Sequence, residues 1–195
     1  MKRAVILVLV CIIYFFPINC FAGQMNTARI LMIIAPYNFR DEELFIPKRI
    51  FEDNGYEVVV ASSSLKTARG MLGALYKPEL LLKQVRVKDY KAIVLVGGSG
   101  SVVYFNNRIL HHIVREALKE HKVLGAICLA PCILAKAGVL KGKRATVWYS
   151  AKECLIKNGA IYTGKPVEVD GKIVTASGPF AARKFAHTIL KVLKK

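Results

Sequence analysis

Acidic residues are scarce in this sequence, and so are the residues that mark fibrous, disulfide-rich or low-complexity chains. The 195 residues include five cysteines, seven prolines and fourteen glycines, which excludes a small disulfide scaffold, a fibrous repeat and a low-complexity linker. Hydrophobic residues make up 54% of the chain and its mean hydropathy is +0.37, so intrinsic disorder is excluded as well. The length suffices for one domain with a sizeable core and is too short for two ordinary domains.

The excess of positive charge comes without a pattern for nucleic-acid binding. Thirty Lys and Arg residues against thirteen Asp and Glu give a net charge of +17. The basic residues are scattered, no basic stripe carries interleaved aromatic residues, and neither a helix-turn-helix nor a zinc-finger spacing is present. We therefore expect a solvated lysine-rich surface, no specific nucleic-acid partner and no structural zinc.

The first 23 residues have the pattern of a secretory signal peptide. Lys2 and Arg3 precede an apolar run that extends to Phe16, and small residues follow at the end of the segment. We predict that residues 1–23 are a signal peptide and that the mature chain is exported to the periplasm or another extracytoplasmic space.

Cleavage is expected near Ala22 or Gly23, which leaves residues 24–28 as a short spacer and a mature chain of net charge +15. Because no charge falls within residues 4–23, an uncleaved anchor that tethers the protein to a membrane is the alternative. A lipid-modified Cys20 is a third option.

Downstream of residue 28, buried strand-like runs alternate with helix-like segments. Strands are expected at residues 29–35, 56–61, 91–96 and 122–127, with shorter ones at 145–148, 167–169 and 172–176, and helices at 41–54, 107–120, 129–137 and 180–193. Asp41 is expected to cap the first helix. This alternation predicts one α/β domain over residues 29–195, a three-layer sandwich with a mostly parallel sheet covered by helices on both faces. Ligands of such sheets bind beyond the carboxyl ends of the strands.

Cys128 follows one of the buried strands, in a turn formed by small residues. Ala126 and Ala130 flank it two positions away on either side, with a strand before and a helix after. This is the arrangement of a nucleophile elbow, in which a tight turn presents the nucleophile above a helix N-terminus. The positive helix end would lower the pKa of the thiol, so we expect Cys128 to be the most reactive thiol of the mature chain. The alternative is a buried cysteine that serves as a small hydrophobic residue.

Other residues near this turn have weaker patterns. Cys132 lies one helical turn after Cys128 and is a candidate for resolving an oxidised Cys128 as a disulfide. The alternative is a buried cysteine that faces the sheet, and Cys154 has no evident partner in the sequence. The glycine-rich residues 97–101 lack the lysine and the spacing of a phosphate-binding loop, so we interpret them as a tight turn whose backbone approaches Cys128.

In combination, these segments resemble the PfpI family. The resemblance rests on AICLAP around Cys128, on Gly97-Gly98 at the end of a buried strand, and on DEELFIP, in which Glu43 stands four residues before Pro47. It spans residues 29–193 and implies a flavodoxin-like fold similar to the class I glutamine amidotransferase domain. The family includes an intracellular protease, glyoxalase III enzymes, the parkinsonism-associated deglycase and isocyanide hydratases.

The resemblance also implies roles for four residues. Cys128 corresponds to the nucleophilic or redox-active cysteine, Glu43 to its acidic partner, and Gly98 and Leu129 to the residues whose backbone N–H groups form an oxyanion hole. Two histidines of the family are missing: the residue after the cysteine is Leu129, and the later loop has Trp148. The resemblance implies no cofactor, no metal and a homo-oligomer.

These features lead to three hypotheses for the function. The first is a cysteine-dependent hydrolase or lyase that acts on small carbonyls or their protein adducts, like a glyoxalase or deglycase, in stress protection. The second is a non-catalytic redox sensor or stress chaperone. The third is a binding module in which the cysteine is vestigial. Whether the chain is an enzyme stays open at this point, and the missing histidines argue against peptidase activity.

Overall fold

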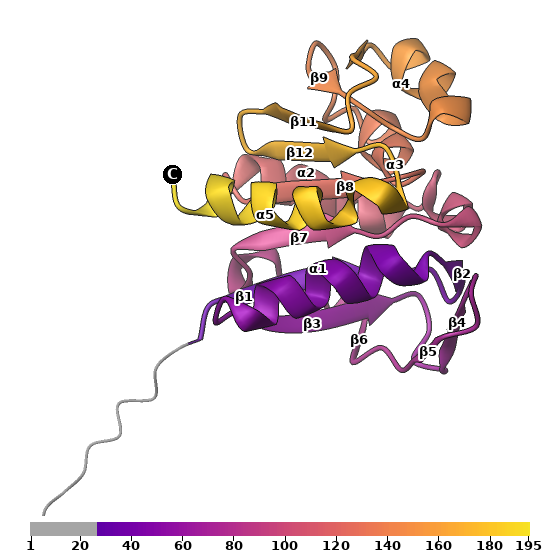
Figure 1. The fold of residues 1–195 in the computed structure, drawn as a ribbon, viewed down its shortest axis with the longest axis vertical. Helices are drawn as coiled ribbons and strands as arrows, with labels where there is room; N and C mark the ends of the chain where they lie inside the picture. Colours follow the sequence, from indigo (N-terminus) through magenta and orange to yellow (C-terminus); the bar gives the residue numbers. More distant parts are fainter. Residues whose placement is uncertain (1–26) are drawn as a thin grey trace, which may run out of the picture.

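The computed structural model describes residues 27–195, which fold into three layers around a seven-stranded sheet (Figure 1). The strand order is β11-β12-β8-β7-β1-β3-β6, and every neighbouring pair is parallel except β11 and β12. The strands are β1 (Arg29–Ile33), β3 (Glu57–Ser62), β6 (Leu80–Leu81), β7 (Ala92–Leu95), β8 (Val123–Ile127), β11 (Val167–Asp170) and β12 (Ile173–Ala176). The mostly parallel α/β sandwich expected from the sequence is therefore confirmed.

Helices cover both faces of this sheet. On one face, α1 (Asp41–Asp53) and α5 (Ala182–Leu193) lie side by side, and on the other lie α2 (Arg108–Lys119), α3 (Pro131–Lys136) and α4 (Lys152–Lys157) (Figure 1). Because both faces are covered, residues 30–34 of the β1 segment are at most 1% exposed, which explains their uninterrupted apolar run.

Short elements complete the domain, and most of them were not foreseen. They are β2 (Tyr37–Phe39), β4 (Ala68–Gly70), β5 (Leu75–Tyr76), β9 (Arg144–Ala145), β10 (Ile161–Tyr162) and the 3-10 helices at Leu82–Gln84, Val87–Asp89, Ser99–Tyr104, Tyr149–Ala151 and Pro179–Ala181. The strand expected at 145–148 is reduced to β9. The helix expected at 129–137 starts later, at Pro131, because the residues after β8 form a turn.

Asp41 has a different role from the helix cap expected from the sequence. Helix α1 has no side-chain cap. Instead, the Asp41 carboxylate accepts hydrogen bonds from the backbone N–H groups of Leu72 (2.8 Å) and Ala74 (3.0 Å). A Cβ atom at Gly70 would collide with this carboxylate. Asp41 therefore holds the β4–β5 hairpin close against the start of α1.

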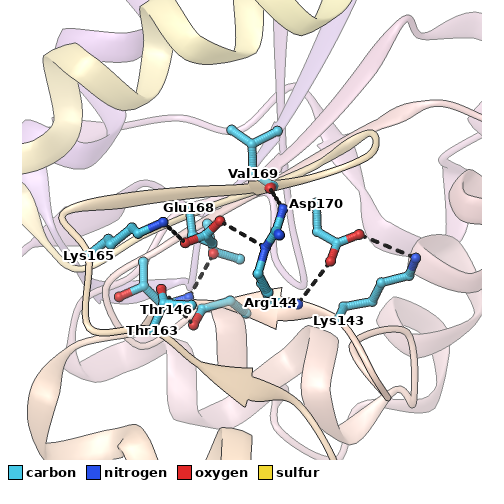
Figure 2. Close-up of polar contacts among 10 residues, drawn as sticks. Lys143, Arg144, Thr146, Thr163, Lys165, Glu168, Val169 and Asp170 are labelled. Carbon is cyan, nitrogen blue, oxygen red and sulfur yellow. Dashed lines mark hydrogen bonds and ion pairs between the residues drawn. The ribbon is translucent and has the colours of Figure 1, made fainter.

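A polar network joins β9 to the edge strand β11 (Figure 2). Glu168 is 5% exposed and lies between the guanidinium of Arg144 (3.4 Å) and the ammonium of Lys165 (3.0 Å). Asp170 accepts a hydrogen bond from the Arg144 backbone N–H (3.0 Å) and pairs with Lys143 (3.3 Å). Burial by itself would raise the pKa of Glu168, but the bond and charge of Lys165 contribute to a net lowering. The network thereby fixes β9. The chain that follows β9 leads to Trp148, whose backbone N–H donates a hydrogen bond to the carbonyl of Cys128, directly after β8.

Several sequence-based expectations fall outside the described residues. These are the signal peptide over residues 1–23, the alternative anchor over 4–23 and the lipid-modified Cys20. The spacer expected at 24–28 is described only from residue 27, where it leads into β1. Within residues 27–195, no helix is both long enough and apolar enough to cross a membrane.

A candidate thiol site at the carboxyl edge of the sheet

Cys128 lies directly after β8, at the carboxyl edge of the sheet. Its φ angle is +61°, a left-handed conformation that is uncommon for a residue other than glycine. Two backbone hydrogen bonds fix it: its N–H donates to the Ala176 carbonyl, and its own carbonyl accepts from the Trp148 N–H, both at 2.9 Å. The surrounding structure thus holds the residue in a strained conformation, a feature that clusters at functional sites.

The Glu43 side chain, in the first turn of α1, extends to Cys128. Its side chain is completely buried, and its Oε2 atom accepts a hydrogen bond from the Gly97 N–H at 3.0 Å. Among the described residues, its Oε1 atom has no well-formed hydrogen bond. A Cβ atom on Gly97 would lie 2.6 Å from the Cβ atom of Cys128 and 2.7 Å from Oε2 of Glu43. Gly97 therefore allows the carboxyl group and the cysteine to approach each other.

Two backbone N–H groups complete the surroundings of the thiol. Those of Gly98 and Leu129 donate to the Cys128 sulfur, and each favours the thiolate. Gly98 has a φ angle of +94°, and a Cβ atom there would lie 2.5 Å from the Arg40 backbone nitrogen. A side chain at this position would thus displace the backbone, whereas glycine lets its N–H point at the sulfur. Paired N–H donors beside a nucleophile have the arrangement required to stabilise an oxyanion.

Burial is the largest influence on the pKa of both side chains. It raises the pKa of Glu43 to about 8 and that of Cys128 to about 12. The charge and hydrogen bond of Glu43 raise the pKa of Cys128 further, and the two N–H donors only partly offset this. The expected lowering of the thiol pKa by a helix end is therefore wrong. Helix α3 begins three residues later and has only six residues.

These two pKa values define how the pair holds its protons. At neutral pH both groups are protonated, and the pair loses its first proton near pH 8. A carboxylate beside a thiol and a carboxylic acid beside a thiolate differ only in the position of one proton. The singly protonated pair therefore includes a form in which Cys128 is a thiolate and Glu43 an acid.

A small pocket of about 260 Å³ opens onto Cys128. Its lining is mostly apolar or backbone and consists of Arg40, Met71, Gly98, Ser99, Cys128, Leu129, Trp148, Pro179 and Phe180. The guanidinium of Arg40 is paired with Glu42 (Nε to Oε2, 2.8 Å), so the Glu42 carboxylate does not simply face solvent, although Glu42 itself does not line the pocket. Sequence reasoning missed Arg40, Met71 and Phe180, because segments distant in the sequence bring them to Cys128.

No histidine among residues 27–195 lines this pocket. Trp148 occupies one wall, and its indole ring packs so closely on Gly178 that a Cβ atom there would lie 2.8 Å from the ring. Two histidines lie on α2, outside the pocket lining. His111 is hydrogen-bonded with the Phe105 carbonyl (3.0 Å), and His112 pairs with Glu116. Among the described residues, the titratable side chain that lies beside the Cys128 thiol is the carboxyl group of Glu43.

Cys132 contacts a different thiol from the one anticipated. It is fully buried in the core between the sheet and α2–α4, whereas Cys128 belongs to the core on the α1–α5 face. Its thiol is hydrogen-bonded with that of Cys154. Cys154 had no evident partner in the sequence because the short helix α4 that carries it was not foreseen. Within the described chain, no group of three Cys, His, Asp or Glu residues could hold a metal ion.

Comparisons with known proteins agree with the fold of this domain. A family model described as the DJ-1/PfpI family matches residues 28–192. An uncharacterized protein of Methanocaldococcus jannaschii, MJ0967, is 47% identical over 175 residues, 88% of this chain and 85% of that protein. The crystal structure of a ThiJ/PfpI domain protein from Brachyspira murdochii superposes with a TM-score of 0.84 at 32% identity, over 86% of this chain and 97% of that one.

Two relatives carry names that state an activity. The deglycase PH1704 of Pyrococcus horikoshii is 30% identical over 84% of this chain and 99% of its own length. The glutathione-independent glyoxalase DJR-1.2 of Caenorhabditis elegans is 26% identical over 84% of this chain and 88% of its own length.

Proposed function

This chain belongs to the DJ-1/PfpI family, and from that premise we propose that it is a cysteine-dependent enzyme acting on 2-oxoaldehydes or on their adducts with protein side chains. The observation that carries the proposal is the meeting of Cys128 and buried Glu43 at Gly97, with the N–H groups of Gly98 and Leu129 directed at the sulfur. Relatives named deglycase and glyoxalase support the substrate class.

The first step that this arrangement supports is addition of the thiol to an aldehyde. In the singly protonated pair, the Cys128 sulfur attacks the aldehyde carbon, and the carbon–sulfur bond forms as the carbonyl π bond breaks. The N–H groups of Gly98 and Leu129 hold the developing oxyanion. Glu43 then gives its proton to that oxygen, and the product is a hemithioacetal. We propose that the turn at Cys128 acts in this way as a nucleophile elbow.

Completion of a glyoxalase reaction requires an isomerisation by two proton transfers and one water molecule. The carbon-bound proton of the hemithioacetal is removed and the adjacent carbonyl oxygen gains a proton, which gives an enediol; the other enediol oxygen then loses its proton as the adjacent carbon gains one, which leaves a thioester on Cys128. Water then cleaves the thioester and releases a 2-hydroxy acid. Glu43, now a carboxylate, is the base within reach for these proton transfers. The sum is a 2-oxoaldehyde plus water giving a 2-hydroxy acid, with no external electron acceptor.

The size of the pocket and its lining favour small substrates over peptides. A mostly apolar space of about 260 Å³ lies below the usual range for drug-sized ligands and suits a carbonyl compound of a few carbons. Peptide cleavage needs an acid that protonates a leaving amine, and no histidine of the described chain is placed to do so. A redox sensor at Cys128 would use the same thiolate form of the pair, so product formation is the readout that distinguishes the two functions.

The direct test of this function is turnover of methylglyoxal to lactate by the purified protein in the absence of added small thiols. We expect lactate formation that depends on Cys128. Binding of methylglyoxal without lactate formation, and without release of amines from methylglyoxal-treated peptides, would exclude both forms of the proposal.

We also propose that residues 1–23 direct export of the protein, on the basis of their basic start, apolar run and small-residue end. The expected result of N-terminal sequencing of protein from the native host is a first residue near Gln24, in an extracytoplasmic fraction. Recovery of an intact Met1 in a membrane fraction would favour the uncleaved anchor, and an intact Met1 in a soluble cytoplasmic fraction would exclude export.

A further inference from the structure

Cys132 and Cys154 form a thiol pair outside the pocket. Cys132, in α3, has no exposed surface, and Cys154, in α4, is half-buried against the same core. The two thiols are hydrogen-bonded to each other. The Cys132 sulfur also lies 3.9 Å from the carbonyl oxygen of Ala151, three residues before Cys154. Cys132 thus lies directly against the start of α4.

The two thiols differ in a way that suits sequential oxidation. The hydrogen bond from Cys132 is the largest influence on Cys154 and lowers the pKa of Cys154, and the charge of Lys136 lowers it further. The same hydrogen bond, together with burial, raises the pKa of Cys132. The more exposed thiol is therefore the one that ionises, and a buried thiol lies beside it. Redox-active cysteines are typically accessible, of low pKa and adjacent to a resolving cysteine.

We propose that Cys132 and Cys154 are a redox site that closes as a disulfide when the protein meets a hydroperoxide. In the first step, the Cys154 thiolate attacks the peroxide; its sulfur becomes a sulfenic acid, and the O–O bond breaks to release water or an alcohol. In the second step, the Cys132 sulfur attacks the sulfenic sulfur. The S–S bond forms, the S–O bond breaks, and the Cys132 proton leaves with the hydroxide as water. The two thiols lose two electrons, and the peroxide gains them.

The bond would join two helices and close a loop that reaches the pocket. Helices α3 and α4 lie next to each other at one end of the molecule (Figure 1). The loop over residues 132–154 includes Trp148, which forms one wall of the pocket. A cross-link across a loop of this length restricts the unfolded chain, so we expect closure to raise the midpoint of thermal unfolding by roughly 5–10 °C. This proposal does not rest on the enzymatic function.

The experiment is peroxide titration of the purified full-length protein, followed by blocking of free thiols with N-ethylmaleimide and mapping of non-reduced tryptic peptides. Cys128 and Cys132 fall in one peptide, residues 123–136, and Cys154 falls in another, residues 153–157. The Cys128→Ser variant makes the assignment unambiguous. We expect residues 123–136 cross-linked to 153–157 in both the wild type and this variant, with the rise in unfolding temperature reversed by dithiothreitol.

The Cys154→Ser variant is the matched control, and we expect it to lose both the cross-link and the temperature shift. The proposal is overturned if peroxide instead joins Cys128 to Cys132 within one peptide. It is equally overturned if Cys154 is oxidised without forming a cross-link, or if the temperature shift persists in Cys154→Ser. None of these outcomes depends on methylglyoxal turnover, so failure here and failure of the proposed enzyme activity are distinguishable.

Discussion

Replacement of Cys128 by serine is expected to lower kcat/KM for methylglyoxal about a thousandfold or more. A serine hydroxyl is a far weaker nucleophile at neutral pH, and no histidine of the described chain is placed to activate it. Loss of the nucleophile in a serine protease costs about a millionfold in kcat. The measurement is the initial rate of lactate formation, with dithiothreitol removed just before the assay and the rate without enzyme subtracted.

The control is Cys154→Ser, which removes the most exposed thiol of the described chain and leaves the pocket intact. We expect turnover within about twofold of the wild type for this variant. If Cys128→Ser retains most of the activity, Cys128 is not the nucleophile. If both variants lose activity equally, the effect reflects general thiol chemistry and contradicts a specific site.

Replacement of Glu43 by glutamine is expected to make the protein more stable than the wild type at alkaline pH. The pKa of Glu43 is raised from its usual 4.5 to about 8 by burial, so the folded state binds one more proton than the unfolded state between these values. The free energy of unfolding of the wild type therefore falls as pH rises through this window, and the loss is complete above pH 8. The total is about 5 kcal/mol at 1.36 kcal/mol per pKa unit. Glutamine stays neutral and keeps an acceptor for the Gly97 N–H.

Urea unfolding of the wild type and Glu43→Gln at pH 5 and pH 9, under reducing conditions, measures this effect. We expect similar stabilities at pH 5 and a clear advantage of the variant at pH 9. The Glu42→Gln variant is the matched control, because Glu42 is adjacent but pairs with Arg40 at the pocket rim. Parallel pH dependence of the wild type and Glu43→Gln would show that Glu43 is ionised in the folded protein at neutral pH.

The layers of the fold could be predicted because parallel strands covered on both faces are continuous apolar runs. The segments that became β1, β7 and β8 have this pattern, and each ends near the strand end observed in the structure. The two-residue strands and the hairpin over residues 68–76 could not be predicted in the same way. The position of the hairpin depends on a hydrogen-bonding partner distant in the sequence, the Asp41 carboxylate.

The residues of the candidate site could be named from the sequence, but the direction of their pKa shifts could not. The pattern of small residues pointed to Cys128 and the family resemblance to Glu43 as its partner, and the structure brings the two together at Gly97. The direction of the thiol pKa could not be predicted, because it depends on how completely the fold buries both groups. The pairing of Cys132 with Cys154 could not be predicted either, because no local sequence pattern indicated the short helix that carries Cys154.

The pH dependence of kcat/KM for methylglyoxal, compared between the wild type and Glu43→Gln, tests most directly whether Cys128 and Glu43 act as one proton-sharing pair. The reactive form carries one proton, so the wild-type rate should rise as pH passes through about 8, where the pair loses its first proton. In Glu43→Gln the thiol must ionise alone, and its burial should move the rise at least one pH unit higher, while Glu42→Gln keeps the wild-type profile. An unchanged rise near pH 8 in Glu43→Gln would contradict the account.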